Sequence, residues 1–517
     1  MSRLDDVAVL FTSCMKDPVR PKGCARLLCG CLHVLDGQSE DTRFALLERY
    51  NMPNYEDYEY IRRTYSEYLS ACAAFLSLPL STQDEEELNS SLRTCTCFRR
   101  DERNPGELLL WLHTFETAHE FALDDFIQAL IRHLAGILNN AVKTKTVPGV
   151  AALRGLKRYR KKYAANPPWP VDKSQLIPHG IEQSMKGYAE AFRWCPLDRF
   201  HDGLLLVDKL LAICGRSVIA HLLQFLPEFP IRITGLSNAL CQECEATRGT
   251  TVDFGVERSW MCTLVIIVDF CRTLLTLGET TSTDISLFVR VAAPYKGTNR
   301  SIGLLFVCDT ILNHLPLIRE STTLFTEFYF NEFAMTFARF GAIFYSYNSP
   351  EDTTVYHDAI LLLHEELADD YEDSSKAAWE GFVWISAIRR CCAPECPETF
   401  VTAQRTFARC AGCGVPRYCS RECQKLAWKH AVFPHKDVCT KLRVLKERTN
   451  LPKDRVLTQN EHMPFIDACN ADDELAALAQ ECGRHLRNMM KARKESVPEA
   501  FEAFQAKLAK GADPATK

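Results

Sequence analysis

Apolar side chains recur at steps of three and four residues through most of the first 388 positions. This spacing places them on one face of an α-helix. The clearest runs cover residues 58–76, 108–119, 126–138 and 206–225, and a further run covers 475–489. Short alternating segments joined by Asn-Gly or Asp-Gly turns, which are typical of β-hairpins, do not occur. We therefore predict a mainly α protein.

Loop-forming residues divide the predicted helices into regions. Asn104-Pro105 predicts a helix start, Pro227 a helix end, and the Pro-rich stretch at 166–170 a longer break. We expect an N-terminal helical region at 1–166, a second helical region at 171–388, a small module at 389–441 and a helical tail at 442–517. The sequence shows no repeat of fixed period, so an irregular α-solenoid of stacked helix pairs and an ordinary helical domain are both compatible with it.

Composition indicates a soluble globular protein of several domains. The chain has 517 residues, 47% hydrophobic and 25% charged, with a net charge of −5. Residues 1–9 carry three charges and lack the apolar core of a secretory signal. The most apolar stretches, 203–226 and 260–277, are interrupted by charged residues before reaching the roughly 18 uncharged positions of a membrane span. We expect an intracellular protein, in the cytoplasm or the nucleus, with no membrane partner.

Eight of the 24 cysteines lie in one stretch of 49 residues, from Cys391 to Cys439. In a reducing compartment such a cluster favours metal binding over disulfides. Two closely spaced residues can bind one Zn²⁺ ion, which needs four nitrogen or sulfur ligands in a tetrahedron. Three such pairs are evident, namely Cys410 with Cys413, Cys419 with Cys423, and His435 with Cys439.

Two complete tetrahedra need a fourth pair before Cys410. Cys396 is one member, and its mate is either Cys391 or Cys392. Pro394 lies close by and permits the longer loop, which favours Cys391. We predict two zinc ions with eight protein ligands.

The segment from Tyr418 to Gln424, followed by Trp428, His435 and Cys439, resembles the MYND zinc finger. The run from Cys396 to Phe400 and the insertion between Trp428 and His435 are similar to those of fungal members of that family. The resemblance covers only residues 391–439 and implies cross-braced ion binding. One ion would be held by Cys391, Cys396, Cys419 and Cys423, and the other by Cys410, Cys413, His435 and Cys439.

The histidine departs from the family pattern. The family usually places it three residues after the tryptophan, whereas His435 lies seven residues after Trp428. His430 is therefore a rival ligand, although its distance from Cys439 breaks the family's histidine–cysteine spacing.

Both predicted zinc sites are closed, with four protein ligands each, so the metal is expected to be structural. The resemblance implies peptide binding, often of proline-containing segments, with Gln424 and Trp428 at the peptide groove. An exposed tryptophan offers a flat apolar face for proline. The alternative is that Trp428 only packs the small zinc core.

The module is basic, with 11 Lys or Arg against four Asp or Glu between Arg389 and Arg443. These charges are scattered among the ligands without a recognition-helix pattern. The other basic run, at 157–162, is typical of a solvated helix face before a linker. Nucleic acid is therefore not the expected partner.

Other cysteine pairs give weaker signals. Cys241 and Cys244, Cys95 and Cys97, and Cys29 and Cys31 each lack a second pair at zinc spacing. We interpret all three as pairs without a metal.

A non-catalytic adaptor is the expected function, with regulation of transcription as a candidate process. The alternative is a lysine methyltransferase that carries a MYND finger within a SET catalytic domain. That architecture needs a long segment after the finger and an Asn-His-Ser-Cys-type motif, whereas only 78 residues follow Cys439. A glycine-rich phosphate loop, a GxSxG elbow and an HExxH helix are also absent from the sequence.

Overall fold

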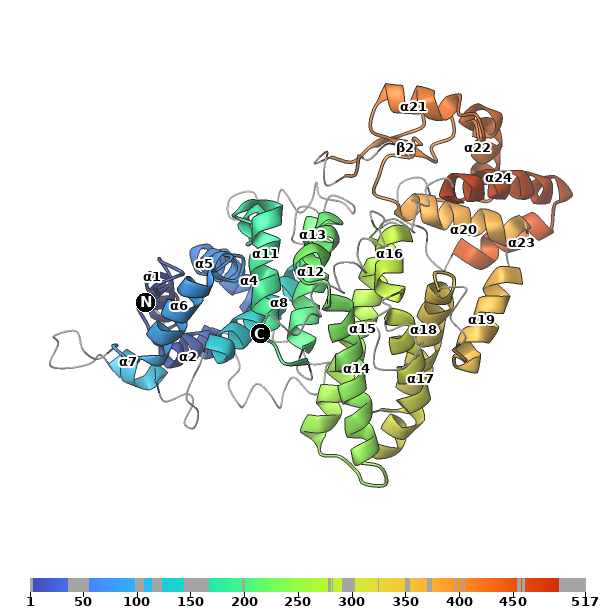
Figure 1. Ribbon diagram of the computed structural model, residues 1–517. Helices are drawn as coiled ribbons and strands as arrows, with labels where there is room; N and C mark the ends of the chain where they lie inside the picture. The colour runs from blue at the N-terminus through green and yellow to red at the C-terminus, as the bar shows by residue number, and fades with distance from the viewer. Residues whose placement is uncertain are drawn as a thin grey trace. The chain divides into compact units, whose positions relative to one another are not determined.

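In a computed structural model of the chain, the described residues are mainly helical (Figure 1). The structure describes residues 3–35, 55–97, 107–113, 123–143, 167–197, 200–277, 280, 282–290, 303–323, 325–348, 354–369, 374–394, 396, 398–400, 403, 405–452, 457 and 461–491. The basic run at 157–162 and the end of the predicted tail lie outside these residues. The predicted mainly α fold class is confirmed.

The chain divides into two compact units, residues 1–229 and 230–517. This division differs from the predicted boundary at 166–171. The reason is that α8 (Leu123–Lys143) packs against α12 (His201–Cys214), so helices from both sides of the Pro-rich break share one core.

The first unit is built around α8. Phe126, Leu130, Leu134 and Leu138 on one face of α8 are fully buried, as their spacing predicts. The predicted helix at 58–76 is two helices, because the helical backbone is interrupted at Tyr65. The run at 108–119 forms helix only as far as Leu112, and residues 114–122 lie outside the described part. The helices of this unit are α1 (Arg3–Cys14), α2 (Ala25–Leu35), α4 (Tyr55–Thr64), α5 (Ser66–Leu76), α6 (Thr82–Arg93), α7 (Glu107–Leu112), α8, the 3₁₀ turn η2 (Lys173–Gln175), α11 (Gly180–Arg193), α12 and α13 (Ser217–Phe225).

The second unit begins with longer helices. These are α14 (Phe229–Ala246), α15 (Phe254–Thr276), α16 (Ser282–Val289), α17 (Leu304–Ser321), α18 (Glu327–Tyr345) and α19 (Asp358–Asp369). By length and composition alone α15 could cross a membrane, despite the charges of Asp269 and Arg272. Half of its most apolar window is buried, and the core helix of a soluble protein passes the same test.

The remainder of the second unit holds the cysteine-rich segment and its supporting helices. The segment contains the strands β1 (Ala408–Arg409) and β2 (Arg417–Tyr418), which pair antiparallel, then α21 (Arg421–Trp428) and the 3₁₀ turn η4 (His435–Asp437). Around it lie α20 (Ser374–Ala387), α22 (Cys439–Arg448), α23 (His462–Asn470) and α24 (Asp473–Lys491). We call these four helices the helical base.

Helices α20 and α24, which precede and follow the cysteine-rich segment, cross closely. A Cβ added at Gly381 would lie 2.6 Å from the Leu486 Cβ, and one at Gly483 would lie 3.0 Å from the Ala378 backbone. A larger residue would clash at Gly381 and would be tightly packed at Gly483. Buried residues of the base and of the cysteine-rich segment form one continuous apolar cluster. The predicted boundaries at 389 and 441 therefore fall within a shared core.

Candidate metal centre

Two four-residue clusters lie in the cysteine-rich segment, each with its ligand atoms all within 4.8 Å of one another. The members are Cys391, Cys396, Cys419 and Cys423 in the first cluster, and Cys410, Cys413, His435 and Cys439 in the second. The ligand pairs alternate between the clusters, which is the cross-braced arrangement that the resemblance implies.

The first cluster gathers the loop after α20 and the start of α21. Cys391 is fully buried, and Cys419 directly follows β2. Cys423 occupies the first turn of α21, whose N-cap Ser420 accepts a hydrogen bond from the Cys423 N–H at 3.2 Å. This cap orients the first turn, so the Cys423 sulfur faces the other three.

The second cluster lies deeper, and all four of its members are buried. Cys410 and Cys413 lie in a tight turn after β1, which Gly414 closes with a positive φ of 65°. A Cβ at Gly412 would lie 2.8 Å from the Cys439 sulfur, so this turn needs glycine. His435 comes from η4 and Cys439 begins α22.

Distances within both clusters fit tetrahedral zinc. Zn–S bonds of about 2.3 Å place two sulfurs of a tetrahedron about 3.8 Å apart. The Cys396–Cys419 and Cys396–Cys423 sulfur separations are both 3.7 Å, and the Cys410–Cys439 separation is 3.8 Å. The 3.3 Å between the Cys419 and Cys423 sulfurs is shorter than this edge but far longer than a disulfide bond. The cysteines of both clusters form no disulfides in the structure, so thiolates are available as ligands.

The structure favours Cys391 over Cys392 as the first ligand. The Cys391 sulfur accepts hydrogen bonds from the N–H groups of Ala393 and Cys419, both at 3.4 Å. Burial raises the pKa of Cys391, so its thiolate needs a nearby cation at neutral pH. Cys392 belongs to neither cluster and donates its N–H to the Arg417 carbonyl.

His430 is placed away from the ligands. Its ring packs on Phe433 with the centroids 3.8 Å apart, and its Nδ1 accepts the N–H groups of Val432 and Phe433. The His435 Nε2, in contrast, lies 3.5 Å from the Cys413 sulfur. The rival histidine therefore supports the loop, and His435 provides the nitrogen ligand of the second cluster.

Gln424 acts on the metal centre in addition to any role at the surface. Its side-chain N–H₂ donates to the Cys410 sulfur at 3.5 Å. Such a bond orients a thiolate ligand and offsets part of its charge. Sequence reasoning assigned Gln424 only to a peptide groove.

His485 of α24 lies against the second cluster, a contact that its position on an amphipathic helix does not predict. Its ring centroid is 6.1 Å from that of His435 and 6.2 Å from that of Phe433. Among the described residues, neither the His435 Nδ1 nor the His485 Nε2 has a hydrogen-bond partner, although both are buried. Burial and the neighbouring His435 lower the pKa of His485 to about 4, so this ring is neutral at pH 7.

A family model for the MYND finger matches residues 392–439. This segment is a MYND finger. The match begins one residue after Cys391, but the clustered sulfurs show that the metal centre includes that cysteine. No curated protein and no solved structure gives a significant match to the chain. The finger binds two zinc ions, as the two clusters indicate, and it is a protein-interaction module.

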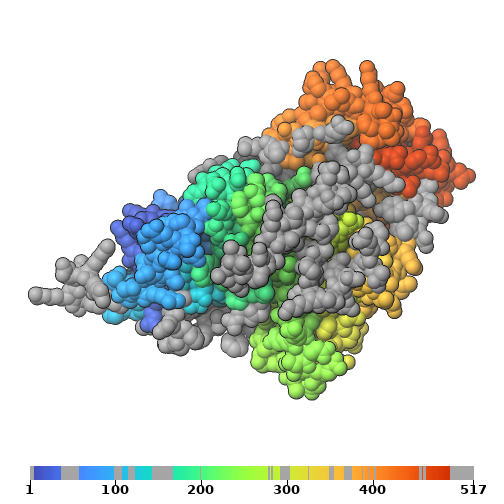
Figure 2. Space-filling model, viewed as in Figure 1, coloured from blue at the N-terminus to red at the C-terminus, as the bar shows by residue number. Residues whose placement is uncertain are grey.

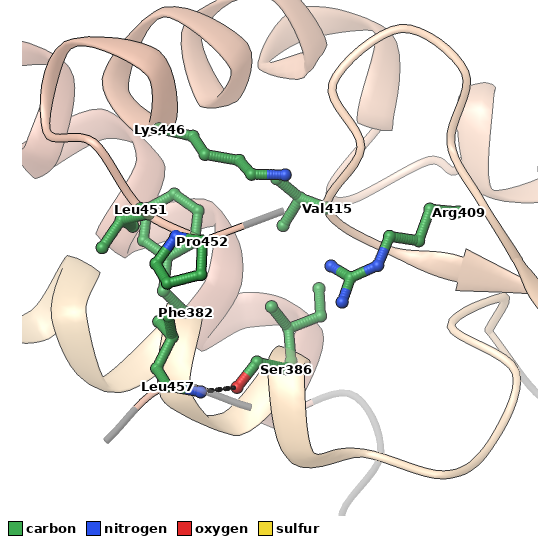
Figure 3. Close-up of a pocket in the computed structure, with 9 residues that line it drawn as sticks. Phe382, Ser386, Arg409, Val415, Lys446, Leu451, Pro452 and Leu457 are labelled. Carbon is green, nitrogen blue, oxygen red and sulfur yellow. Dashed lines mark hydrogen bonds between the residues drawn. The ribbon is translucent and has the colours of Figure 1, made fainter. Parts of the chain in front are cut away.

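The finger and its base also enclose a small cavity (Figure 3). Arg409 and Val415 of the finger face Phe382 and Ser386 of α20 across it, and the Leu457 N–H donates to the Ser386 hydroxyl at 3.1 Å. Its volume of about 20 Å³ admits roughly one water molecule. The cavity is therefore a packing gap, too small for a ligand.

Proposed function

We propose that this protein is a non-catalytic adaptor whose MYND finger binds peptide segments of other proteins. The observation that carries this proposal is the contrast between the interior and the surface of the finger. Four protein ligands surround each metal position, which leaves no ligand position for a substrate. The surface of the finger, in contrast, exposes large apolar side chains, namely Trp428 (38% exposed), Leu426 (65%) and Val432 (74%).

Trp428 is the central contact of the proposed peptide site. It ends α21, and its ring packs edge-on against the ligand His435 with the centroids 5.9 Å apart. A ring that is anchored on one side and exposed on the other loses little freedom when a peptide binds. In Figure 2 the finger, coloured orange, presents a broad surface to solvent.

A proline-containing segment suits this surface. Proline-rich chains form a preorganised polyproline II helix, and aromatic faces bind its rings. Gln424 lies one helical turn before Trp428, and its side-chain oxygen would accept a backbone N–H of the peptide. The amide N–H₂ of Gln424 would remain on the Cys410 sulfur, so the metal centre and the peptide site would share one side chain.

We place the protein inside the cell, in the cytoplasm or the nucleus, because seven ligand cysteines must stay reduced. Regulation of transcription is a process in which such an adaptor would serve. A lysine methyltransferase is the competing function, and it would require catalysis by a part of the chain other than the finger.

The test is a titration of labelled proline-rich peptides with the full chain. Trp428→Ala should weaken binding at least tenfold, with its zinc content unchanged. Val355→Ala is a suitable control, because Val355 is 85% exposed and lies outside the finger. Equal affinity of Trp428→Ala and wild type would contradict the proposed site, and methyl transfer by the full chain from a labelled donor would overturn the non-catalytic function.

A further inference from the structure

A third cluster of metal-ligating side chains lies in the first unit, far along the chain from the finger. It contains Cys24, Cys95, Cys97 and His113, whose ligand atoms all lie within 4.8 Å of one another. The Cys24 sulfur is 3.7 Å from the Cys97 sulfur and 3.4 Å from the His113 Nε2. The Cys95 sulfur is 3.7 Å from the same nitrogen.

These separations are those of a tetrahedral zinc site. Zn–S and Zn–N bonds of about 2.3 and 2.0–2.1 Å place two sulfurs about 3.8 Å apart, and a sulfur about 3.5 Å from a nitrogen. The donor set is three thiolates and one imidazole, which is a common structural set for Zn²⁺.

The orientation of His113 fits a metal ligand. Its Nδ1 lies 2.6 Å from the carbonyl oxygen of Leu109. A carbonyl can only accept, so Nδ1 carries the proton and donates it. The unprotonated Nε2 then directs its lone pair at the three sulfurs, and a backbone carbonyl on the other nitrogen is the usual support of a metal-bound histidine.

Packing brings the four residues together at helix ends. Cys24 precedes α2, Cys95 and Cys97 follow α6, and His113 follows α7. Figure 1 shows α7 beside α2, and a Cβ at Gly30 of α2 would lie 2.2 Å from the Leu112 carbonyl oxygen. This contact fixes the residue before His113. Helix α7 has only six residues, too few to be stable alone, so it needs an anchor of this kind.

We propose that Cys24, Cys95, Cys97 and His113 bind a third, structural Zn²⁺ ion. The three thiols release their protons to solvent as the thiolates bind, and the neutral imidazole adds its lone pair. The ion joins the ends of three helices that are distant in sequence. Four protein ligands complete its coordination, so its role is to hold α7 and the 95–97 segment on α2.

The first test is the zinc content of the purified full chain. We expect three ions per chain in wild type and two in Cys95→Ser/Cys97→Ser. His113→Cys should retain three, because a fourth thiolate replaces the imidazole. The matched control is Cys262→Ser, a half-buried cysteine of α15 outside every cluster, which should also retain three. Two ions per chain in wild type would overturn the proposal.

A second test on the wild-type chain does not depend on the folding of a variant. Alkylation followed by mass spectrometry should show Cys95, which is exposed, protected in the zinc-loaded chain and modified after chelation. Equal modification of Cys95 with and without zinc would contradict the site. A disulfide between Cys24 and Cys97 would instead block their alkylation until a reductant is added, and this outcome would also refute zinc binding.

Discussion

The finger and the N-terminal cluster present the same kinds of ligand, but they assemble them over different lengths of chain. The finger collects eight ligands between Cys391 and Cys439, whereas the N-terminal cluster collects four between Cys24 and His113. The apolar residues of the finger share one core with the helical base, and metal binding supplies much of the folding energy of such modules. The first unit already has a core around α8, so a metal there joins elements that are largely folded.

The comparison predicts the largest effect for Cys413→Ser. Loss of the second finger ion should remove hydrogen-exchange protection from residues 405–448 and from α24, because Phe433 and His435 contact His485. The opening free energy should fall by more than about 5 kcal/mol, since structural zinc contributes about 10–16 kcal/mol in small fingers. Helix α8 should keep its protection in Cys413→Ser. The control Cys262→Ser should leave hydrogen exchange unchanged throughout the chain. Full protection of α24 in Cys413→Ser would show that the finger and the base fold independently.

A smaller effect is expected from Cys97→Ser in the first unit. Exchange should accelerate in α7 and at residues 95–97, whereas α8 should change little. The expected cost is about 1–3 kcal/mol, typical for loss of one anchoring contact beside an intact core. If α8 lost protection as well, the difference between the two regions would disappear, and the N-terminal core would itself depend on metal.

Gly412→Ala should have the smallest of these effects. The added methyl group would lie 2.8 Å from the Cys439 sulfur and displace it from its tetrahedral position. We expect zinc affinity of the second finger cluster to fall about tenfold, or about 1.4 kcal/mol. Competition with a chelator measures this change, with Ala411→Ser at the exposed neighbouring position as the control. Identical affinities of the two variants would show that the turn can widen without cost.

The helical fold and the two-zinc finger follow from short-range patterns. Helix faces repeat every three or four residues, and each ligand pair of the finger spans at most six positions, so both features are visible in single windows of sequence. The choice between Cys391 and Cys392 needed the structure, because spacing allows either. The same holds for His430 and His435, which differ in what their ring nitrogens contact.

Features that depend on distant segments could not be predicted. Cys95 and Cys97 have no neighbouring pair in sequence, and only the packing of α2, α6 and α7 brings Cys24 and His113 to them. His485 occupies an ordinary position on an amphipathic helix, and its contact with a zinc ligand requires α24 to fold back on the finger. The domain boundaries were predicted from prolines and composition. These features likewise carry no information about which helices pack together.

The glycine-mediated crossing of α20 and α24 has a mechanical consequence. Helix α20 precedes the finger and α24 follows it, and the two helices pack against each other outside the metal-binding segment. Tension along the polypeptide, from a moving partner or from a translocating protease, would therefore load the Gly381–Leu486 contact first. Such a force would pass through the contact between α20 and α24 and not through the finger. A peptide bound beside Trp428 would therefore stay on a folded finger while the rest of the chain is pulled.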